Sequence, residues 1–265
     1  MPALVDTHCH LDAGEFDPDR EAVIARAREA GVTRQVLPAV DARGWPALAA
    51  LCTEDSGLHP AFGLHPMYLA GHRAEHLTAL REWLADHRPV AVGECGLDHY
   101  MDDLDPDQQR LYFEAQLRLA REFDLPVIIH ARRAVEEVIH TLRRIDGLRG
   151  VVHSFPGSLE QAEQLHELGF LLGFGGPVTY ERAQRLRRVV AKVPLEQLLL
   201  ESDAPDQPDA AIRGQRNEPA RVRRVLDVVA ELRGDTPDAI ARATTANAER
   251  LFNLPPAPAC PHPSQ

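Results

Sequence analysis

The chain has 265 residues, of which 44 % are apolar, and this is enough for one large domain such as an α/β barrel of about 250 residues. No run approaches the roughly 18 consecutive apolar residues of a membrane span, and the N-terminal segment lacks the basic and apolar regions of a secretory signal. The formal net charge of −11 argues against a generally adhesive nucleic-acid-binding surface, although it allows a local basic rim or a metal-centred phosphate site.

Eight short apolar runs along the chain predict eight buried strands. They cover residues 3–9, 34–40, 59–64, 90–95, 126–131, 150–155, 169–175 and 197–202. Runs that are apolar throughout are typical of parallel sheets covered on both faces. The amphipathic segments between them predict helices, including one over residues 19–31 and one over residues 107–124.

The helix expected over residues 107–124 has a clear start signal. Asp105 is a favourable N-cap and Pro106 suits the first helical position. An apolar residue recurs every four positions and predicts one packed face. This face comprises Leu111, Ala115, Leu119 and Phe123.

The C-terminal part begins with a long polar loop over residues 203–219, and two helices are expected near residues 219–232 and 236–252. The proline-rich segment 255–265 predicts a disordered tail. Cys260 and His262 lie in that tail and are poor candidates for chemistry. We therefore expect a single domain over residues 1–254.

The alternation of strands and helices predicts an α/β fold, a (β/α)8 TIM barrel of amidohydrolase-like type. The main rival is a doubly wound open sheet. No G-x-G-x-x-G motif opens a helix, which weakens the nucleotide-binding version of that rival. The four cysteines form no C-x-x-C pair, and this favours reduced thiols in a cytoplasmic protein.

Metal-capable side chains stand at the carboxyl ends of five of the predicted strands. In a barrel all these ends lie on the face that carries active sites. Taken singly, each is more often a hydrogen-bonded core residue, an ion-pair partner or a turn-former, whereas a metal centre explains the whole set with one cause. The six residues are His8, His10, Glu94, His130, His153 and Asp203.

Spacing supports a shared site. His8 and His10 are two residues apart, so on a strand their side chains point the same way, while Cys9 points toward the helix layer. Nitrogen and oxygen donors suit divalent cations such as Zn or Mn, whereas Mg, which prefers oxygen, fits less well. Two ions about 3.5–4 Å apart need a bridging ligand, and we expect Glu94 to bridge because it is the carboxylate of the central strands.

The segments "DTHCHLD" (6–12), "GECGLD" (93–98), "IIHAR" (128–132), "VHSF" (152–155) and "ESDAP" (201–205) resemble, in order, the signatures of the TatD family of metal-dependent hydrolases. "GGPVTYERA" (175–183) and "LLLESDAPD" (198–206) resemble most the YjjV-like branch of that family. The resemblance implies a barrel with a divalent metal centre and metal-dependent nuclease activity on DNA.

The resemblance also implies roles for single residues. His8 and His10 would bind one metal that Asp203 approaches, Glu94 would bridge, and His130 and His153 would bind the second metal. "FGLHP" (62–66) resembles the segment whose histidine faces the substrate, so His65 is a candidate phosphate contact. His99 departs from the pattern, and its role stays open between a rim residue, a substrate contact and neutral variation.

Phosphodiester hydrolysis is the reaction expected from these residues. A metal lowers the pKa of a bound water, and Asp203 would act as general base or orient that water. Rim arginines would clamp the phosphate, with Arg132 the preferred candidate, although single arginines are more often solvated surface. The others in suitable loops are Arg182, Arg213 and Arg216.

We expect DNA ends or single strands as substrate, with RNA possible, and no obligate protein partner. The alternatives are hydrolysis of acyl esters or amides, including deacylation of acyl-tRNA, and a non-catalytic barrel with a structural metal. The carboxylated-lysine bridge of some amidohydrolases is excluded because Lys192, the only lysine, ends no predicted strand. A structural zinc site is closed and four-coordinate, whereas six ligands for two ions leave open positions.

Overall fold

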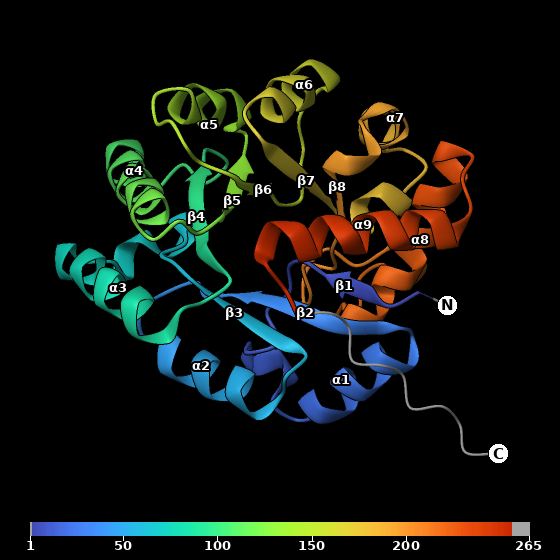
Figure 1. Ribbon diagram of the computed structural model, residues 1–265, viewed down its shortest axis with the longest axis horizontal. Helices are drawn as coiled ribbons and strands as arrows, with labels where there is room; N and C mark the ends of the chain where they lie inside the picture. Colours follow the sequence, from blue (N-terminus) through green and yellow to red (C-terminus); the bar gives the residue numbers. More distant parts are fainter. Residues whose placement is uncertain (1, 256–265) are drawn as a thin grey trace.

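In the computed structural model, which describes residues 2–255, eight parallel strands follow one another in chain order around a nearly closed barrel (Figure 1). Backbone N–H and side-chain hydroxyl of Thr7 both donate to the Leu200 carbonyl at 3.0 Å, which joins the first strand to the last. The predicted (β/α)8 barrel is confirmed. The strands are β1 Leu4–Asp6, β2 Val32–Pro38, β3 Leu58–Phe62, β4 Ala91–Asp98, β5 Val127–Arg132, β6 Gly150–Val152, β7 Phe170–Phe174 and β8 Leu198–Leu200.

Helices form a ring outside the strands (Figure 1). The two predicted C-terminal helices are confirmed as α8 and α9. The helices are α1 Arg20–Glu29, α2 Trp45–Glu54, α3 Ala74–His87, α4 Pro106–Glu122, α5 Val135–Leu142, α6 Leu159–Glu167, α7 Gln184–Lys192, α8 Val222–Arg233 and α9 Pro237–Phe252. None of the helices within residues 2–255 is long and apolar enough to span a membrane.

Helix α4 starts as predicted, but its predicted apolar face is buried only in part. The Asp105 side chain accepts from the backbone N–H groups of Asp107 and Gln108 at 2.9 and 3.3 Å. The predicted apolar face is wrong at Leu111, which is 52 % exposed. A four-residue repeat drifts by about 40° per step around a helix of 3.6 residues per turn, so it does not follow one face. The buried residues of the helix are Gln109, Tyr112, Phe113, Gln116, Leu117, Leu119 and Ala120, of which Leu119 was predicted.

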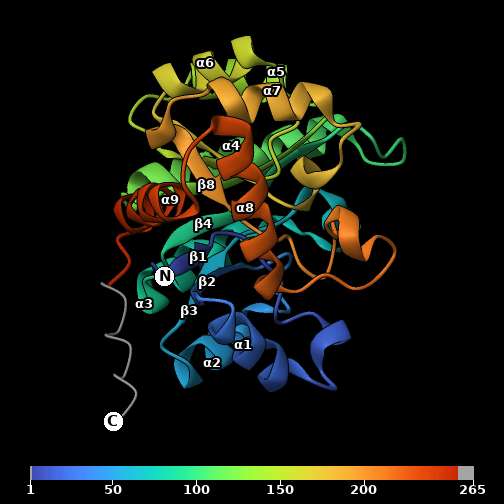
Figure 2. The same cartoon turned by 90° about the vertical axis from the view of Figure 1, so that its right-hand side faces the viewer.

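The barrel interior has its own apolar core, separate from the layer between sheet and helices. Helix α9 packs against β1 and β8 across the amino end of the barrel (Figures 1 and 2). Its apolar side chains join the interior core and close that end. The open end is therefore the carboxyl end. The interior core comprises Val5, Val36, Ala61, Ala91, Ile128, Val151 and Leu199, with Leu251 and Phe252 of α9.

The carboxyl ends of all eight strands differ from the predicted ones, by one to three residues. Strands β1 and β8 stop early, at Asp6 and Leu200, because the segments beyond them pair with each other. Asp203 N donates to the His8 carbonyl at 2.9 Å, and His10 N donates to the Ala204 carbonyl at 2.7 Å. Strand β4 runs three residues further than predicted, to Asp98, along β5.

Cysteines agree with the sequence prediction as far as the described residues reach. Cys9, Cys52 and Cys95 are free thiols, and Cys9 packs in the cluster between sheet and helices, away from His8 and His10. Cys260 and His262 lie outside the described residues, as does the predicted tail apart from Pro255.

Candidate metal centre

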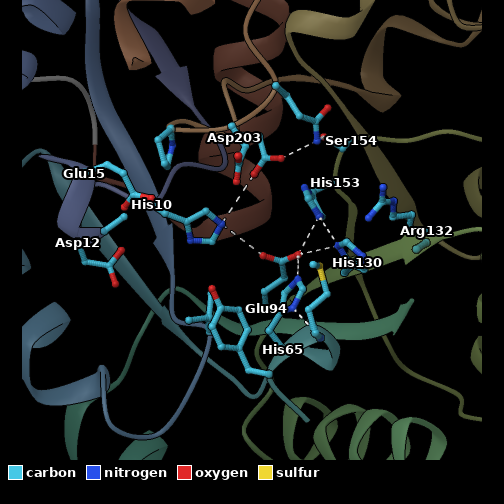
Figure 3. Close-up of a pocket in the computed structure, with 18 of the residues that line it drawn as sticks. His10, Asp12, Glu15, His65, Glu94, His130, Arg132, His153, Ser154 and Asp203 are labelled. Carbon is cyan, nitrogen blue, oxygen red and sulfur yellow. Dashed lines mark hydrogen bonds and ion pairs between the residues drawn. The ribbon is translucent and has the colours of Figure 1, made fainter. Parts of the chain in front are cut away.

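The six predicted residues meet at the carboxyl end of the barrel, beside a cavity of about 790 Å³. Figure 3 shows all of them except His8. His8 is fully buried, while the other five line the cavity. His65 and Arg132 line the same cavity. The strands place them together: Glu94 and His130 lie on the paired strands β4 and β5, and His153 directly follows β6.

A close approach of two strands brings Glu94 and His130 together. Gly96 has φ +144°, and a Cβ at this position would lie 2.9 Å from the backbone carbonyl carbon of His130. A side chain at residue 96 would therefore push β4 away from β5.

Glu94 stands at the middle of the site, and its two carboxylate oxygens face different histidines (Figure 3). Oε2 lies 3.0 Å from His8 Nε2 and 3.6 Å from His10 Nε2. Oε1 lies 2.9 Å from His65 Nε2, 3.1 Å from His130 Nδ1 and 2.8 Å from His153 Nε2. The carboxylate therefore divides the histidines into two sets.

Asp203 completes the set around Oε2 of Glu94. Its Oδ1 lies 3.5 Å from His8 Nε2 and 3.7 Å from His10 Nε2. Its Oδ2 accepts a hydrogen bond at 2.5 Å from Gln207 Nε2, which also donates to Ser154 Oγ at 2.8 Å. Gln207 thereby holds one oxygen and leaves the other facing the histidines.

The hydrogen bonds on the far side of each ring fix which nitrogen carries a proton. Carbonyls and carboxylates only accept, so His10 Nδ1 donates to the Pro38 carbonyl at 3.1 Å and His130 Nε2 donates to Asp98 Oδ2 at 2.9 Å. In the neutral rings, the lone pairs of His10 Nε2 and His130 Nδ1 then point into the site.

His65 is arranged the other way round. The backbone N–H of Met67 donates to His65 Nδ1 at 3.1 Å, so the neutral ring carries its proton on Nε2 and donates it to Glu94. Burial lowers the pKa of His65 to about 4, although Glu94 opposes this, and the ring is neutral at pH 7.

These donors fit a divalent cation. Two ligands of one tetrahedral ion, each about 2.1 Å from it, lie about 3.4 Å apart. His8 Nε2 and His10 Nε2 are 3.2 Å apart, as are His130 Nδ1 and His153 Nε2. The described residues contain three groups with suitable donor atoms within 4.8 Å of one another: His8, Glu94 and His153; His8, His10 and Asp203; and His65, Glu94 and His130.

The charges within the site are strongly coupled. Burial disfavours the charged form of Glu94, but His153, His65 and His8 outweigh it and hold the pKa of Glu94 well below its usual range. Burial likewise opposes protonation of His153, but Glu94 raises the pKa of that histidine to about 10. Burial, followed by the charge of His153, lowers the pKa of His8 far below its usual value.

Two buried carboxylates behind the histidines were missed by the sequence analysis. Asp98 accepts from His130, and Glu201 Oε1 lies 3.8 Å from His153 Nδ1 while it accepts from Ser154 N at 2.5 Å. Both carboxylates are fully buried. A signal for Asp98 existed, because it lies four residues after Glu94 and hence on the same strand face.

Of the rim candidates, Arg132 is the arginine that lines the cavity among the described residues. Its guanidinium lies 3.7 Å above the Tyr100 ring, and its Nη1 lies 3.9 Å from Asp98 Oδ2. His99 lies in a separate hollow, with Nε2 3.5 Å from Glu137 Oε2. Outside the lining of the main cavity lie Arg182, Arg213 and Arg216.

A nearly closed (β/α)8 barrel with a histidine- and carboxylate-rich centre at its carboxyl end defines a metal-dependent hydrolase. A family model described as TatD related DNase matches residues 5–253. The chain belongs to the TatD-related DNase family, as its signatures suggested.

Individual relatives agree with this membership. The chain is 45 % identical to the uncharacterized metal-dependent hydrolase YjjV of Escherichia coli strain K12, over 95 % of this chain and 98 % of the relative. It is 36 % identical to a protein of Erwinia tasmaniensis named 3'-5' ssDNA/RNA exonuclease TatD, over 95 % of this chain and 100 % of the relative. The crystal structure of Escherichia coli YjjV superposes with a TM-score of 0.92 at 43 % identity, over 95 % and 98 % of the two chains.

Proposed function

We propose that this protein is a deoxyribonuclease that hydrolyses phosphodiester bonds with two divalent cations, acting on DNA ends or single strands and also on RNA. The observation that carries the proposal is Glu94, whose two oxygens face two separate sets of histidines. Two ions that share a carboxylate can stabilise the attacking and leaving oxygens of an in-line displacement. The name of the Erwinia relative supports a nucleic-acid substrate.

We assign His8, His10 and Asp203 to the first ion, His130 and His153 to the second, and Glu94 to both. The inward lone pairs of His10 and His130 support this assignment. Imidazole-rich ligation favours Zn or Mn over Mg. His65 is left outside the ligand set, because the Met67 N–H occupies its Nδ1 and keeps the proton of the neutral ring on the inward Nε2, whereas no donor occupies Nδ1 of His153 among the described residues.

When bound, the two ions supply positive charge against the phosphoryl oxygens and make a bound water acidic enough to attack at neutral pH. Asp203 Oδ1 accepts the proton of the attacking water, while Gln207 keeps the carboxylate in place. Burial is the main cause that raises the pKa of Asp203, and a more basic carboxylate takes that proton more readily.

Two further side chains then act on the substrate. His65 lines the cavity, and its Nε2–H, which faces Glu94 in this structure, would be free to donate to a phosphate once bound cations engage the Glu94 carboxylate. The guanidinium of Arg132 offers paired N–H groups to a phosphate.

The proposal is tested with metal-free protein reloaded with Zn, Mn or Mg. Substrates are single-stranded and duplex DNA labelled at either end, single-stranded RNA, p-nitrophenyl acetate and an aminoacyl-tRNA. We expect release of nucleotides from DNA, and loss of that activity in Glu94→Gln. Turnover of the acyl substrates alone would replace the nuclease by an acyl hydrolase, and one tightly held zinc with no hydrolysis would indicate a structural metal.

We also propose that the protein works in the cytoplasm and needs no obligate protein partner. Free thiols at Cys9, Cys52 and Cys95 support the location, because thiols stay reduced in the cytoplasm. Size-exclusion chromatography of the active protein, together with fractionation of its source cells, tests both statements.

A further inference from the structure

Exposed apolar side chains gather at the mouth of the metal-centre cavity. Among residues 2–255, four large apolar side chains are strongly exposed. Met67 and Tyr68, 42 % and 46 % exposed, line the cavity, and Tyr100 carries the guanidinium of Arg132 on its ring. The fourth, Leu111, lies on α4. Exposed apolar groups beside a polar cavity mark a surface that a ligand covers.

Tyr68 is held close to the site by its backbone. It lies in the short helical turn Pro66–Gly71, directly after His65, and its N–H donates to the His65 carbonyl at 3.1 Å. Its ring centre is 5.8 Å from that of His65, whose Nε2 is 2.9 Å from Glu94. The turn is fixed while the ring stays accessible, as expected of a pre-organised contact surface.

Charge is distributed unequally around the cavity. Asp12, Glu15 and Asp206 line one wall, and Figure 3 shows Asp12 and Glu15 across Glu94 from Arg132. Tyr68 belongs to the acidic side of the cavity. Partial burial raises the pKa of Tyr68, and nearby carboxylates, among them Asp206 and Glu15, raise it further. A phosphate is repelled from that side, whereas an uncharged base is not. Arg132 attracts the phosphate chain on the opposite side.

We propose that Tyr68, flanked by Met67, is a stacking platform for the base of the terminal nucleotide, and that the strand leaves the cavity over Arg132 and Tyr100. The inference rests on the proposed nuclease function and adds to it the side chain that contacts the terminal base. Every base has a π-face, so stacking on an aromatic ring binds single strands with little sequence preference. A terminal base that is paired and stacked in a duplex must first be freed.

A double-mutant cycle between protein and substrate tests the platform. KM is measured for wild type, Tyr68→Ala and Tyr68→Phe on a single-stranded oligonucleotide, and on the same strand with an abasic residue at the end that wild type degrades. We expect Tyr68→Ala to raise KM by roughly 5- to 150-fold on the intact strand and by far less on the abasic one. Tyr68→Phe keeps the ring and is expected to stay near wild type.

Leu111→Ala, which removes an equally exposed apolar side chain on α4, is the matched control and leaves KM unchanged. An equal rise of KM on intact and abasic strands for Tyr68→Ala, or no rise at all, overturns the platform and leaves the nuclease function standing. If wild type cleaves neither DNA nor RNA, the proposed function fails and the platform fails with it.

Discussion

His130 on β5 donates a hydrogen bond from Nε2 at 2.9 Å to Oδ2 of Asp98, which lies on β4 two residues beyond the register partner of His130. The same carboxylate accepts from the backbone N–H of Tyr100 and lies 3.9 Å from the guanidinium of Arg132. Asp98 therefore connects a candidate metal ligand to the arginine at the rim. It holds the His130 ring so that Nδ1 faces Glu94.

Replacing Asp98 by Asn tests this positioning role. The neutral amide is a weaker acceptor for the His130 ring, so we expect metal affinity to fall about 10- to 100-fold. Affinity is measured by calorimetric titration of the metal-free protein, and the tautomer of His130 is followed by nitrogen-15 NMR.

Asp209→Asn is the matched control for Asp98→Asn, because Asp209 is also a fully buried aspartate but pairs with Arg221. Its metal affinity should equal that of wild type. If both variants lose affinity to the same extent, the effect comes from general destabilisation and the positioning role of Asp98 is wrong.

Removing the side-chain amide of Gln207 should slow turnover with little change in KM. Gln207→Ala frees Asp203 Oδ2, so the carboxylate can turn away from His8 and His10. Loss of such an orienting partner typically costs about 10- to 100-fold in activity. Steady-state kinetics on single-stranded DNA measures this, with the surface variant Gln184→Ala as control; an unchanged kcat contradicts the role.

Gly173→Ala should destabilise the barrel, because a Cβ at this position lies 2.7 Å from the carboxylate carbon of the fully buried Glu201. Overpacking of this kind costs about 1–3 kcal/mol. Urea denaturation measures the free energy of unfolding. The double variant Gly173→Ala, Glu201→Ala should regain part of the loss, and Gly71→Ala, with open space around it, should lose little. If Gly173→Ala were as stable as Gly71→Ala, Glu201 would be able to move aside and the predicted clash would be wrong.

Much of this architecture could be predicted from the sequence because its signals are local. Strands buried on both faces are apolar throughout, and the polar residues that interrupt them at their carboxyl ends are the ones that converge on Glu94. The barrel then brings the ends of distant strands to one face, so His8 and Asp203 become neighbours although 195 positions separate them in the numbering.

The rest depended on contacts that a local pattern does not contain. Strand β4 continues to Asp98 because it pairs with β5. The predicted strand stopped at residue 95, so Asp98 was not recognised as a residue of the site. Gln207 lies in an irregular loop with no period to indicate where its side chain points. The buried face of α4 is determined by the barrel on which it packs. Apolar spacing alone predicted that Leu111 is buried, whereas it is exposed.

Acid should weaken the fold through His59, which lies on β3, away from the metal centre. Burial, with the nearby charge of Arg34, lowers the pKa of His59 to about 4, compared with 6.5 in an unfolded chain. Between these two values the unfolded state binds more protons, so stability is lost as pH falls from about 6.5 to about 4. This loss of folding free energy is on the order of 2 kcal/mol near the acid end of the range, and we expect it to be absent in His59→Gln. Urea denaturation at pH 7, 6, 5 and 4.5 measures the difference between variant and wild type. The exposed-histidine variant His166→Gln is the control, and a difference that does not change with pH would show that His59 is not the group responsible.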